Sequence, residues 1–234
     1  MKFSFIIPAY NEEKFLGRCI KSIKAQNRRD CEIIVSYSPS RDKTLKIAKK
    51  HRVKIVTIPK SFPGKARNAG ASVAKGAYLV FVDADTVLPE NFLGSTVEYL
   101  DNGYTAIAYR SHWIEREKWL DIIGEAVINP VSKITKLFAF CFTIKNSVFR
   151  ASGGFDEGKE VSEDWDLSQK VKKFGKTAFA TNTIVKVSAR RYLKFGKIRA
   201  MAMYFSWFLL GYVLRQKVKY FHLSDVGSRR PKKQ

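Results

Sequence analysis

The stretch Tyr78-Leu79-Val80-Phe81-Val82-Asp83-Ala84-Asp85 decides the fold class and gives the first indication of a site. Its first five residues are apolar throughout, which is typical of a strand buried on both faces of a parallel sheet. Asp83 and Asp85 follow at a two-residue spacing, so their side chains point to the same side of an extended chain. Carboxylate oxygens suit Mg²⁺ or Mn²⁺, hard cations that proteins usually share with substrate phosphates. The alternative is structural, because one of these acids could cap the helix predicted after Pro89.

Short apolar runs alternate with helical patterns through the first half of the chain. Strands connected through helices pair in parallel, which predicts an α/β, Rossmann-like, mostly parallel sheet flanked by helices. In such sheets ligands bind beyond the carboxyl ends of the strands, here at residues 8–12, 36–42 and 83–86. We predict strands at 3–8, 32–35, 53–58 and 78–82, and helices at 11–23, 42–50 and 64–75.

The second half of the sequence is less regular. We predict strands at 106–110, 138–144, 177–180 and 184–187, a helix at 161–173 and a long helix at about 195–220. We expect a catalytic unit at residues 1–190. Residues 191–234, which combine an apolar helix with a basic tail, form the second expected unit.

Three further groups of side chains carry chemistry. Tyr10 could stack on a nucleotide base, although residues 8–12 would equally form an ordinary turn into a helix, with Asn11 as its cap. Lys65 and Arg67 lie at the start of a predicted helix, where anions bind, or they belong to a polar surface turn. Glu163 and Asp164 belong to the densest acidic cluster. Asp164 is either a general base facing a cleft or an acid that matches the helix dipole.

Five motifs occur in a fixed order along the chain: Ile6-Ile7-Pro8-Ala9-Tyr10-Asn11-Glu12-Glu13, Ala66-Arg67-Asn68-Ala69-Gly70, Val82-Asp83-Ala84-Asp85, Gly153-Gly154-Phe155-Asp156-Glu157 and Glu163-Asp164-Trp165-Asp166-Leu167. Together they resemble the family 2 glycosyltransferases over roughly residues 2–175. The resemblance implies a GT-A fold, an inverting reaction with a nucleoside-diphosphate sugar, and a divalent metal, Mg²⁺ or Mn²⁺.

The resemblance also implies roles for individual residues. Asp164 matches the catalytic base, Asp85 the metal ligand, and Gly153, Gly154 and Glu163 the acceptor side. The donor would be bound by Pro8, Tyr10, Glu12, Lys65, Arg67, Asn68 and Asp83. Relatives commonly carry two adjacent Asp residues after the second strand, one of which contacts uracil. This sequence instead has Val35-Ser36-Tyr37-Ser38, so both a UDP-sugar and a GDP-sugar remain open.

Charge and the C-terminal segment bear on the partners. The chain has 43 Lys and Arg against 21 Asp and Glu, a formal net charge of +22, which favours anionic surfaces. The uncharged apolar run 200–214 is too short to span a bilayer, and its basic flanks suit a membrane interface or, alternatively, packing on the core or on a second subunit. Arg190 and Arg191 could pair with the phosphate of a lipid-linked acceptor. A polysaccharide acceptor would need Asp164 as a base.

These features predict a metal-dependent glycosyltransferase with a polyprenyl-phosphate, lipid-linked or polysaccharide acceptor. We expect a cytoplasmic protein attached peripherally to the inner face of the membrane, because the sequence opens on the strand-like run 2–7 rather than on a signal peptide. The alternatives are a catalytically inactive nucleotide-sugar-binding membrane scaffold and a basic nucleic-acid-binding protein. The sequence holds no recognised nucleic-acid-binding module, and we expect no nucleic acid as a partner.

Overall fold

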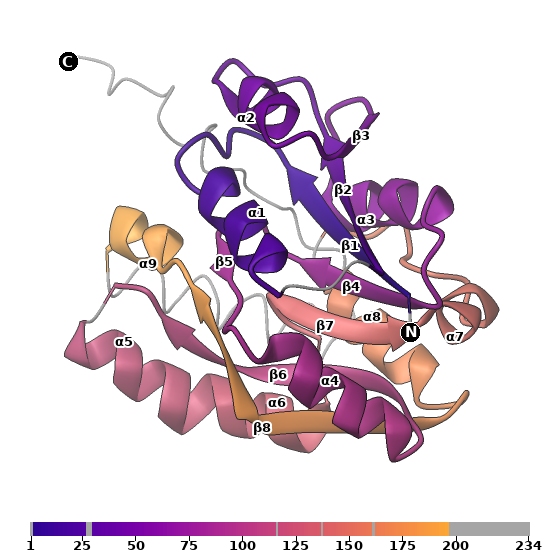
Figure 1. The fold of residues 1–234 in the computed structure, drawn as a ribbon. Coiled ribbons are helices and arrows are strands. Elements are labelled where there is room, and N and C mark those ends of the chain that lie inside the picture. The colour runs from indigo at the N-terminus through magenta and orange to yellow at the C-terminus, as the bar shows by residue number, and fades with distance from the viewer. Residues whose placement is uncertain (1, 27–29, 116, 137, 161, 197–234) are drawn as a thin grey trace.

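A computed structural model describes residues 2–196 except 27–29, 116, 137 and 161 (Figure 1). Its described residues form an eight-stranded sheet with the order β3-β2-β1-β4-β7-β6-β8-β5. The first four strands of this order pair in parallel, and β7 runs antiparallel to both β4 and β6. Strand β8 is parallel to β6 and antiparallel to β5. The α/β class with a Rossmann-like parallel half is therefore confirmed.

The elements follow one another with short connections. The strands are β1 Phe3–Ala9, β2 Cys31–Tyr37, β3 Lys54–Thr57, β4 Tyr78–Val82, β5 Thr86–Val87, β6 Tyr104–Trp113, β7 Cys141–Lys145 and β8 Lys176–Val187. The helices are α1 Leu16–Lys24, α2 Thr44–Lys50, α3 Pro63–Ser72, α4 Phe92–Asp101, α5 Lys118–Ile123, the π-helix Gly124–Ile128, α6 Asn129–Thr135, α7 Asn146–Ala151, α8 Glu163–Val171 and α9 Arg190–Phe195.

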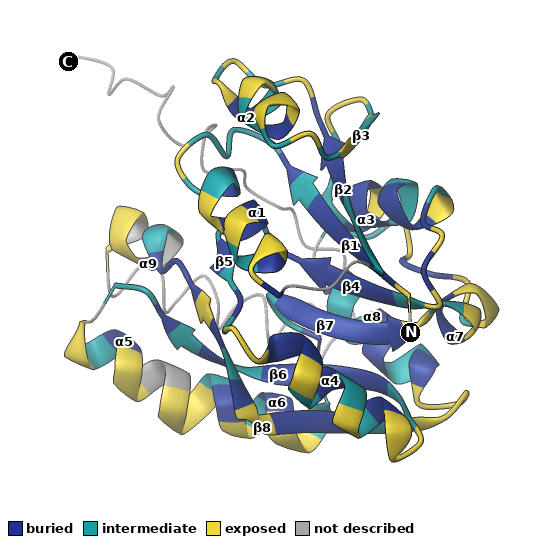
Figure 2. Ribbon diagram, in the orientation of Figure 1, coloured by how far each residue is buried: buried dark blue, intermediate teal, exposed yellow. Residues whose placement is uncertain are grey.

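Helices cover both faces of the sheet, which explains why its central strands are apolar throughout. Residues 79–82 of β4 are at most 1% exposed, as a strand packed on both sides should be. One core lies on the side of α1 and α4 and the other on the side of α3, α7 and α8. In Figure 1, α1 and α4 lie in front of the sheet and α8 lies behind it, while Figure 2 shows the buried strands between them.

The first helix begins at Leu16, five residues later than its sequence pattern predicts. Asn11 adopts a left-handed backbone with φ 56°, which turns the chain away from a helix. Side chains of the β2–α2 segment satisfy the amides that an earlier helix would have used. Ser40 Oγ accepts from Asn11 N, Thr44 Oγ1 from Glu12 N, and Asp42 Oδ2 from Glu13 N. Long-range contacts therefore override the local helical pattern.

Strand β8 is continuous where two short strands were predicted. Its pairing with β6 shifts register between Tyr109 and Arg110, opposite residues 181–183, and this irregularity interrupts the alternation of apolar residues. Thr183 is nevertheless fully buried. The sequence pattern therefore predicts two strands, although the backbone forms one.

A helical run covers the part of β6 that β7 leaves open. Strand β7 pairs with β6 only at residues 106–108, whereas β6 continues to Trp113. The side chain of Asn129 accepts from Ser111 N at 3.1 Å and donates to Ser111 O at 3.0 Å, as a neighbouring strand would do. Trp113 Nε1 donates to Leu120 O. These contacts fix residues 118–135 along the edge of the sheet.

The predicted C-terminal unit falls largely outside the described residues. Helix α9 contains Arg190 and Arg191 and ends at Phe195, whereas most of the predicted helix at 195–220 lies beyond Gly196. The division at residue 190 therefore stays a prediction. Within the part of the chain that the structure describes, no helix has both the length and the apolar content needed to cross a membrane.

Candidate active site

The carboxyl ends of β1, β2 and β4 bring the predicted ligand-binding segments together. Strand β1 pairs with both β2 and β4, so the residues that follow all three strands share one edge of the sheet. Ser38 N donates to Ala9 O, and Asp83 N donates to Phe140 O, which fixes two of these turns. The acids at positions 83 and 85 therefore leave β4 at the edge where the topology predicts a ligand.

Arg67 is the buried centre of the site. Its side chain comes from α3, is 8% exposed, and contacts Asp83 Oδ1 at 2.7 Å and Glu163 Oε1 at 2.8 Å. Burial alone would lower the pKa of this guanidinium, but Asp83 and Glu163 raise it above its usual value. Arg67 thus remains charged and joins the turn after β4 to the start of α8. This one side chain contacts residues that are 16 and 96 positions away in the sequence.

Asp164 lies beside this ion cluster at the first turn of α8. Its pKa is raised to about 7, first by burial and second by the neighbouring Glu163 carboxylate, against the opposing effect of Arg67. Its Oδ1 accepts from Trp165 N at 2.7 Å. A carboxyl group that titrates near neutral pH has the proton affinity that a general base requires.

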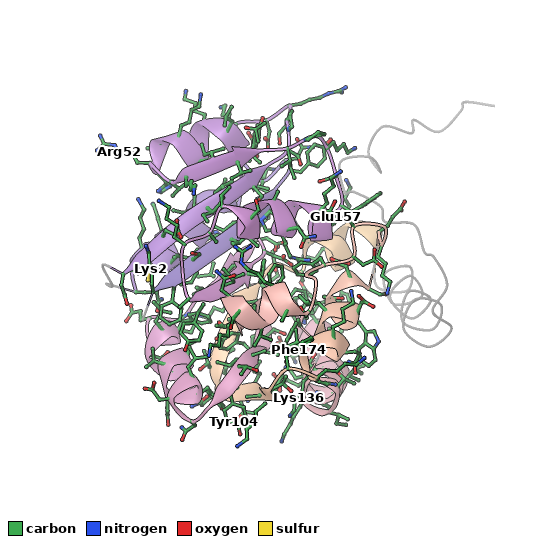
Figure 3. All side chains as sticks on the ribbon, turned by 90° about the vertical axis from the view of Figure 1, so that its right-hand side faces the viewer. Lys2, Arg52, Tyr104, Lys136, Glu157 and Phe174 are labelled. Atoms are coloured by element: carbon green, nitrogen blue, oxygen red, sulfur yellow. The ribbon has the colours of Figure 1, made fainter. Side chains whose placement is uncertain are left out.

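Asn68 connects α3 to the glycine turn at residues 153–154. Its Nδ2 donates to Phe155 O at 2.9 Å, and its Oδ1 accepts from Phe155 N at 3.0 Å. Glu157, labelled in Figure 3 next to α3, accepts a second bond from Asn68 Nδ2. Gly153 and Gly154 have φ of +78° and +67°, and a Cβ on Gly154 would lie 2.9 Å from Asn68 Oδ1. Glycine at position 154 is therefore required by both backbone and space.

Asp85 and Glu12 both form ion pairs with Arg190, which lies near the other end of the described chain. Arg190, at the start of α9, places Nε 3.0 Å from Asp85 Oδ2 and Nη2 2.5 Å from Glu12 Oε1. Its guanidinium also lies 4.4 Å from the centre of the Phe15 ring. Burial would lower the pKa of Arg190, whereas Glu12 and Asp85 raise it. The structure thus places Arg190 against Asp85 and Glu12, two residues with predicted ligand roles.

The remaining predicted residues surround these two clusters. Pro8 lies inside β1, opposite Ser36 of β2, and Tyr10 follows that strand with Lys60 Nζ 4.9 Å from its ring centre. Lys65 is exposed on the first turn of α3. Arg191 belongs to α9, but its side chain is outside the described atoms. The structure tests none of the roles predicted for these residues.

A cavity of about 460 Å³ lies between β6, β8 and the helical run 118–135. Ala106 and Ala108 of β6 pack in the same core as Leu167 of α8, and Arg110 and His112 follow on that face at two-residue steps. His112 therefore lines the cavity from the sheet face on which α8 packs. Its lining residues are Ser111, His112, Trp113, Ile114, Asp121, Glu125 and Lys186.

The chemistry of Asp85 suits a hard divalent cation. Its carboxylate oxygens lie at the carboxyl edge of the sheet and already attract a positive charge, that of Arg190. Among the residues that the structure describes, no three His, Cys, Asp or Glu side chains are grouped as metal ligands. Mg²⁺ is usually bound through one or two carboxylates plus substrate phosphates, so an ion at Asp85 would need further oxygen ligands from a phosphate.

Sequence reasoning missed one residue that shapes the site. Glu115 accepts from Ser188 Oγ and from Ala189 N, both at 2.7 Å, and so fixes the turn that presents Arg190. Ser188 N also donates to Asp85 O. No local pattern marks Glu115, because its partners lie more than 70 residues away and belong to no motif.

Comparisons with known proteins agree with this geometry. The sequence model of glycosyl transferase family 2 matches residues 4–155. The chain is 30% identical over 115 residues to the poly(ribitol-phosphate) beta-N-acetylglucosaminyltransferase TarS of Staphylococcus aureus, covering 46% of this chain and 20% of that protein. It is 28% identical over 188 residues to the chondroitin synthase of Pasteurella multocida, covering 74% and 19%. The chain thus spans about a fifth of the length of these relatives.

Solved structures share the fold at low sequence identity. Staphylococcus aureus TarS in complex with UDP-GlcNAc superposes with a TM-score of 0.68 at 21% identity, covering 81% of this chain and 59% of that one. The mannosyltransferase PcManGT of Pyrobaculum calidifontis, in complex with GDP-Man and Mn²⁺, gives 0.70 at 17% identity, covering 94% and 66%. The sheet and its acidic edge thus define a GT-A fold. The chain belongs to glycosyl transferase family 2.

Proposed function

We propose that this chain is an inverting glycosyltransferase that moves a sugar from a UDP- or GDP-sugar to an acceptor hydroxyl or phosphate. The observation that carries the proposal is the convergence of Asp83, Glu163 and Asp164 around the buried Arg67. Family membership supports the same conclusion. The relatives' donors, UDP-GlcNAc and GDP-Man, keep both nucleotide classes open for this chain.

The proposed reaction is a single displacement at the anomeric carbon. For a hydroxyl acceptor, Asp164 takes the proton as the acceptor oxygen forms a bond to that carbon, while the bond to the diphosphate oxygen breaks. Arg67 holds Asp83 and Glu163 in place beside it through two ion pairs. A phosphate acceptor is already an oxyanion and needs no base. The cavity lined by His112, Glu125 and Lys186 would receive the acceptor head.

Asp85 is the proposed ligand of Mg²⁺ or Mn²⁺, together with donor phosphate oxygens. Such an ion neutralises the charge of the diphosphate leaving group. Arg190 would separate from Asp85 when the ion and the donor bind, because both cations use the same carboxylate. Arg190 and Arg191 would then be available to a phosphate on the acceptor. Residues 191–234 would attach the enzyme peripherally to the membrane, as their basic and apolar composition suggests.

The test is a thermal-shift measurement on the full chain with UDP-GlcNAc or GDP-mannose, each with and without Mn²⁺. At a hundredfold excess over its dissociation constant a ligand stabilises the folded state by about 2.7 kcal/mol. We expect one nucleotide sugar to raise the melting temperature with Mn²⁺, and Asp85→Asn to remove that increase. The exposed Asp101 of α4 provides the control, Asp101→Asn.

Two outcomes would contradict the proposal. If no UDP- or GDP-sugar raised the melting temperature with or without Mn²⁺, the donor assignment would be wrong. If the Asp85→Asn variant kept the full Mn²⁺-dependent increase, the metal assignment would be wrong. Binding without any turnover of the donor would instead favour an inactive nucleotide-sugar-binding protein.

A further inference from the structure

The helical run 118–135 exposes large apolar side chains on its outer side. Ile122 is 65% exposed, Val127 53% and Ile134 80%. We call these three residues the outer face. Figure 2 shows exposed positions along the outward side of α5 and α6. Single exposed apolar residues are ordinary, but three on one helical run form a feature that calls for a partner.

The π-helix aligns the outer face. Ile122 precedes the π-helix Gly124–Ile128, and Val127, five residues later, lies within it. In a π-helix the backbone hydrogen bonds join residues i and i+5. Val127 and Ile134 are seven residues apart, which is close to two α-helical turns. In an uninterrupted α-helix a five-residue step would rotate Ile122 away from the other two side chains. The inserted residue therefore places all three on one side.

The opposite side of the same run is fixed to the protein. Leu120, Asn129 and Ser132 are at most 6% exposed, and Asn129 and Leu120 bond to β6 as described above. The outer side chains therefore have no packing role among the described residues. A helix with one face anchored in the core and an apolar face turned outward is suited to lie flat on a second apolar phase.

Charge favours a lipid bilayer as that phase. Lys118 opens the run, Lys133 lies in its last turn, and Lys136, labelled in Figure 3, follows it. The acids of the run, Asp121 and Glu125, line the cavity instead. The chain carries a net charge of +22, which attracts anionic headgroups. A second protein would have to match this excess of positive charge with a complementary acidic surface, whereas an anionic membrane supplies both the charge and the apolar interior.

The position of the run points to the same partner. Glu115, three residues before α5, bonds to Ser188 and Ala189 immediately before α9, so the two helices start from one tied corner. Leu193 of α9 is 44% exposed. The apolar run 200–214 begins four residues after Gly196, where the described chain ends. The last described helix and the helical run 118–135 therefore start from the same corner.

We propose that the outer face is a membrane-docking surface, which inserts Ile122, Val127 and Ile134 into the interface of an anionic bilayer. The inference rests on the membrane attachment in the proposed function and names the surface that makes the contact. Docking there would hold the cavity between the helical run and β6 close to the lipid headgroups, because both are built on the same helices.

The test is cosedimentation of the full chain with phosphatidylcholine vesicles, with and without phosphatidylglycerol. We expect binding to the anionic vesicles and at least about tenfold weaker binding for the double variant Ile122→Ser, Ile134→Ser, because two apolar side chains lose their burial. The matched control Ile122→Leu, Ile134→Leu keeps the apolar area and should bind like the wild type. Thermal shift with the nucleotide sugar and Mn²⁺, measured on the same variants, separates failure of docking from failure of the proposed function.

Other occupants of the outer face predict different results. Vesicle binding that is equal in the Ser variant and the wild type overturns the proposal. If that result came with a lower melting temperature of the Ser variant, the face would be covered by the chain's own residues 200–214. If it came with a change from dimer to monomer in light scattering, the face would be covered by a second copy. Weaker vesicle binding with unchanged melting temperature and mass supports docking.

Discussion

Two acids on one turn of α8, Asp164 and Asp166, have pKa values that are shifted in opposite directions. Asp164 has a pKa raised to about 7, chiefly by burial. Burial also acts to raise the pKa of Asp166, but Lys159 and Lys170, at 2.8 and 2.7 Å, hold it below its usual value. The difference follows from the partners: Asp164 has Glu163 beside it, and Asp166 has two lysines. Position 164 is thereby suited to exchange a proton near neutral pH, and position 166 is suited to remain charged.

Asp164→Asn should abolish transfer to a hydroxyl acceptor while leaving the donor-dependent thermal shift intact. Wild-type activity should rise with pH through about 7 as the carboxylate forms. Because the folded pKa is raised, the stability contributed by Asp164 is full below the unfolded pKa, about 4, and is lost as the pH rises through 7. Urea unfolding should therefore find the Asn variant increasingly stable relative to wild type from pH 4 to pH 8.

Asp166→Asn is the matched control, with the opposite sign. Its lowered pKa means that its stability is present above the unfolded pKa and is lost as the pH falls. The Asp166 variant should therefore be less stable than wild type at neutral pH and approach it in acid. A pH-independent difference between wild type and Asp164→Asn would show that the pKa of Asp164 is not raised in the folded state.

The helices and strands that could be predicted are those whose pattern lies within their own sequence. Strand β4 and the acids that follow it could be predicted, because an unbroken apolar run has few other interpretations. Helix α8 was predicted with its acidic first turn. The run 118–135 was not predicted, since it contains Gly124, Pro130 and several β-branched residues, and its stability comes from the contacts with Ser111 and Trp113. Contacts with a strand that is distant in the sequence do not produce a hydrophobic periodicity from which a helix could be predicted.

At the glycine turn, Gly154→Ala should destabilise the protein by about 2 kcal/mol or more. The left-handed backbone costs an alanine roughly 1–2 kcal/mol, and its Cβ would also displace Asn68 Oδ1. Gly153→Ala is the control, because it has the same backbone strain and no atom within 4 Å of its Cβ. It should cost only about 1 kcal/mol in urea unfolding. Equal losses for the two variants would mean that Asn68 does not hold the turn.

At the scale of the whole molecule, a residue near the end of the described chain contacts one near its start. Arg190 joins Glu12 after β1 to Asp85 after β4, so the last described helix lies on the first loop. The motif order allowed Glu12 and Asp85 to be predicted as neighbours at one edge. The arrival of Arg190 could not be predicted, because it depends on the curl of the sheet that pairs β5 with β8. Its predicted role, pairing with a phosphate on the acceptor, stays a prediction.

Arg190→Met should increase the response of the protein to Mn²⁺ alone. The variant removes the guanidinium that contacts Glu12 and Asp85, and carboxylates bind a divalent ion more strongly when a competing cation is lost. We expect a lower melting temperature than wild type without metal and a larger increase on adding Mn²⁺. Arg18→Met is the control, since Arg18 also lies over Phe15 but is exposed and contacts neither carboxylate. An identical Mn²⁺ response in wild type and the Arg190 variant would exclude competition.

The contact between Asn129 and Ser111 has a consequence for self-association. A bare strand edge can recruit the edge of another molecule and extend the sheet across the boundary between chains. Here a carboxamide imitates a peptide group and occupies both the N–H and the C=O of Ser111 on that edge. An apolar residue at position 129 would free these two groups. The polar side chain thereby keeps another chain from extending the sheet at Ser111, a form of protection against aggregation.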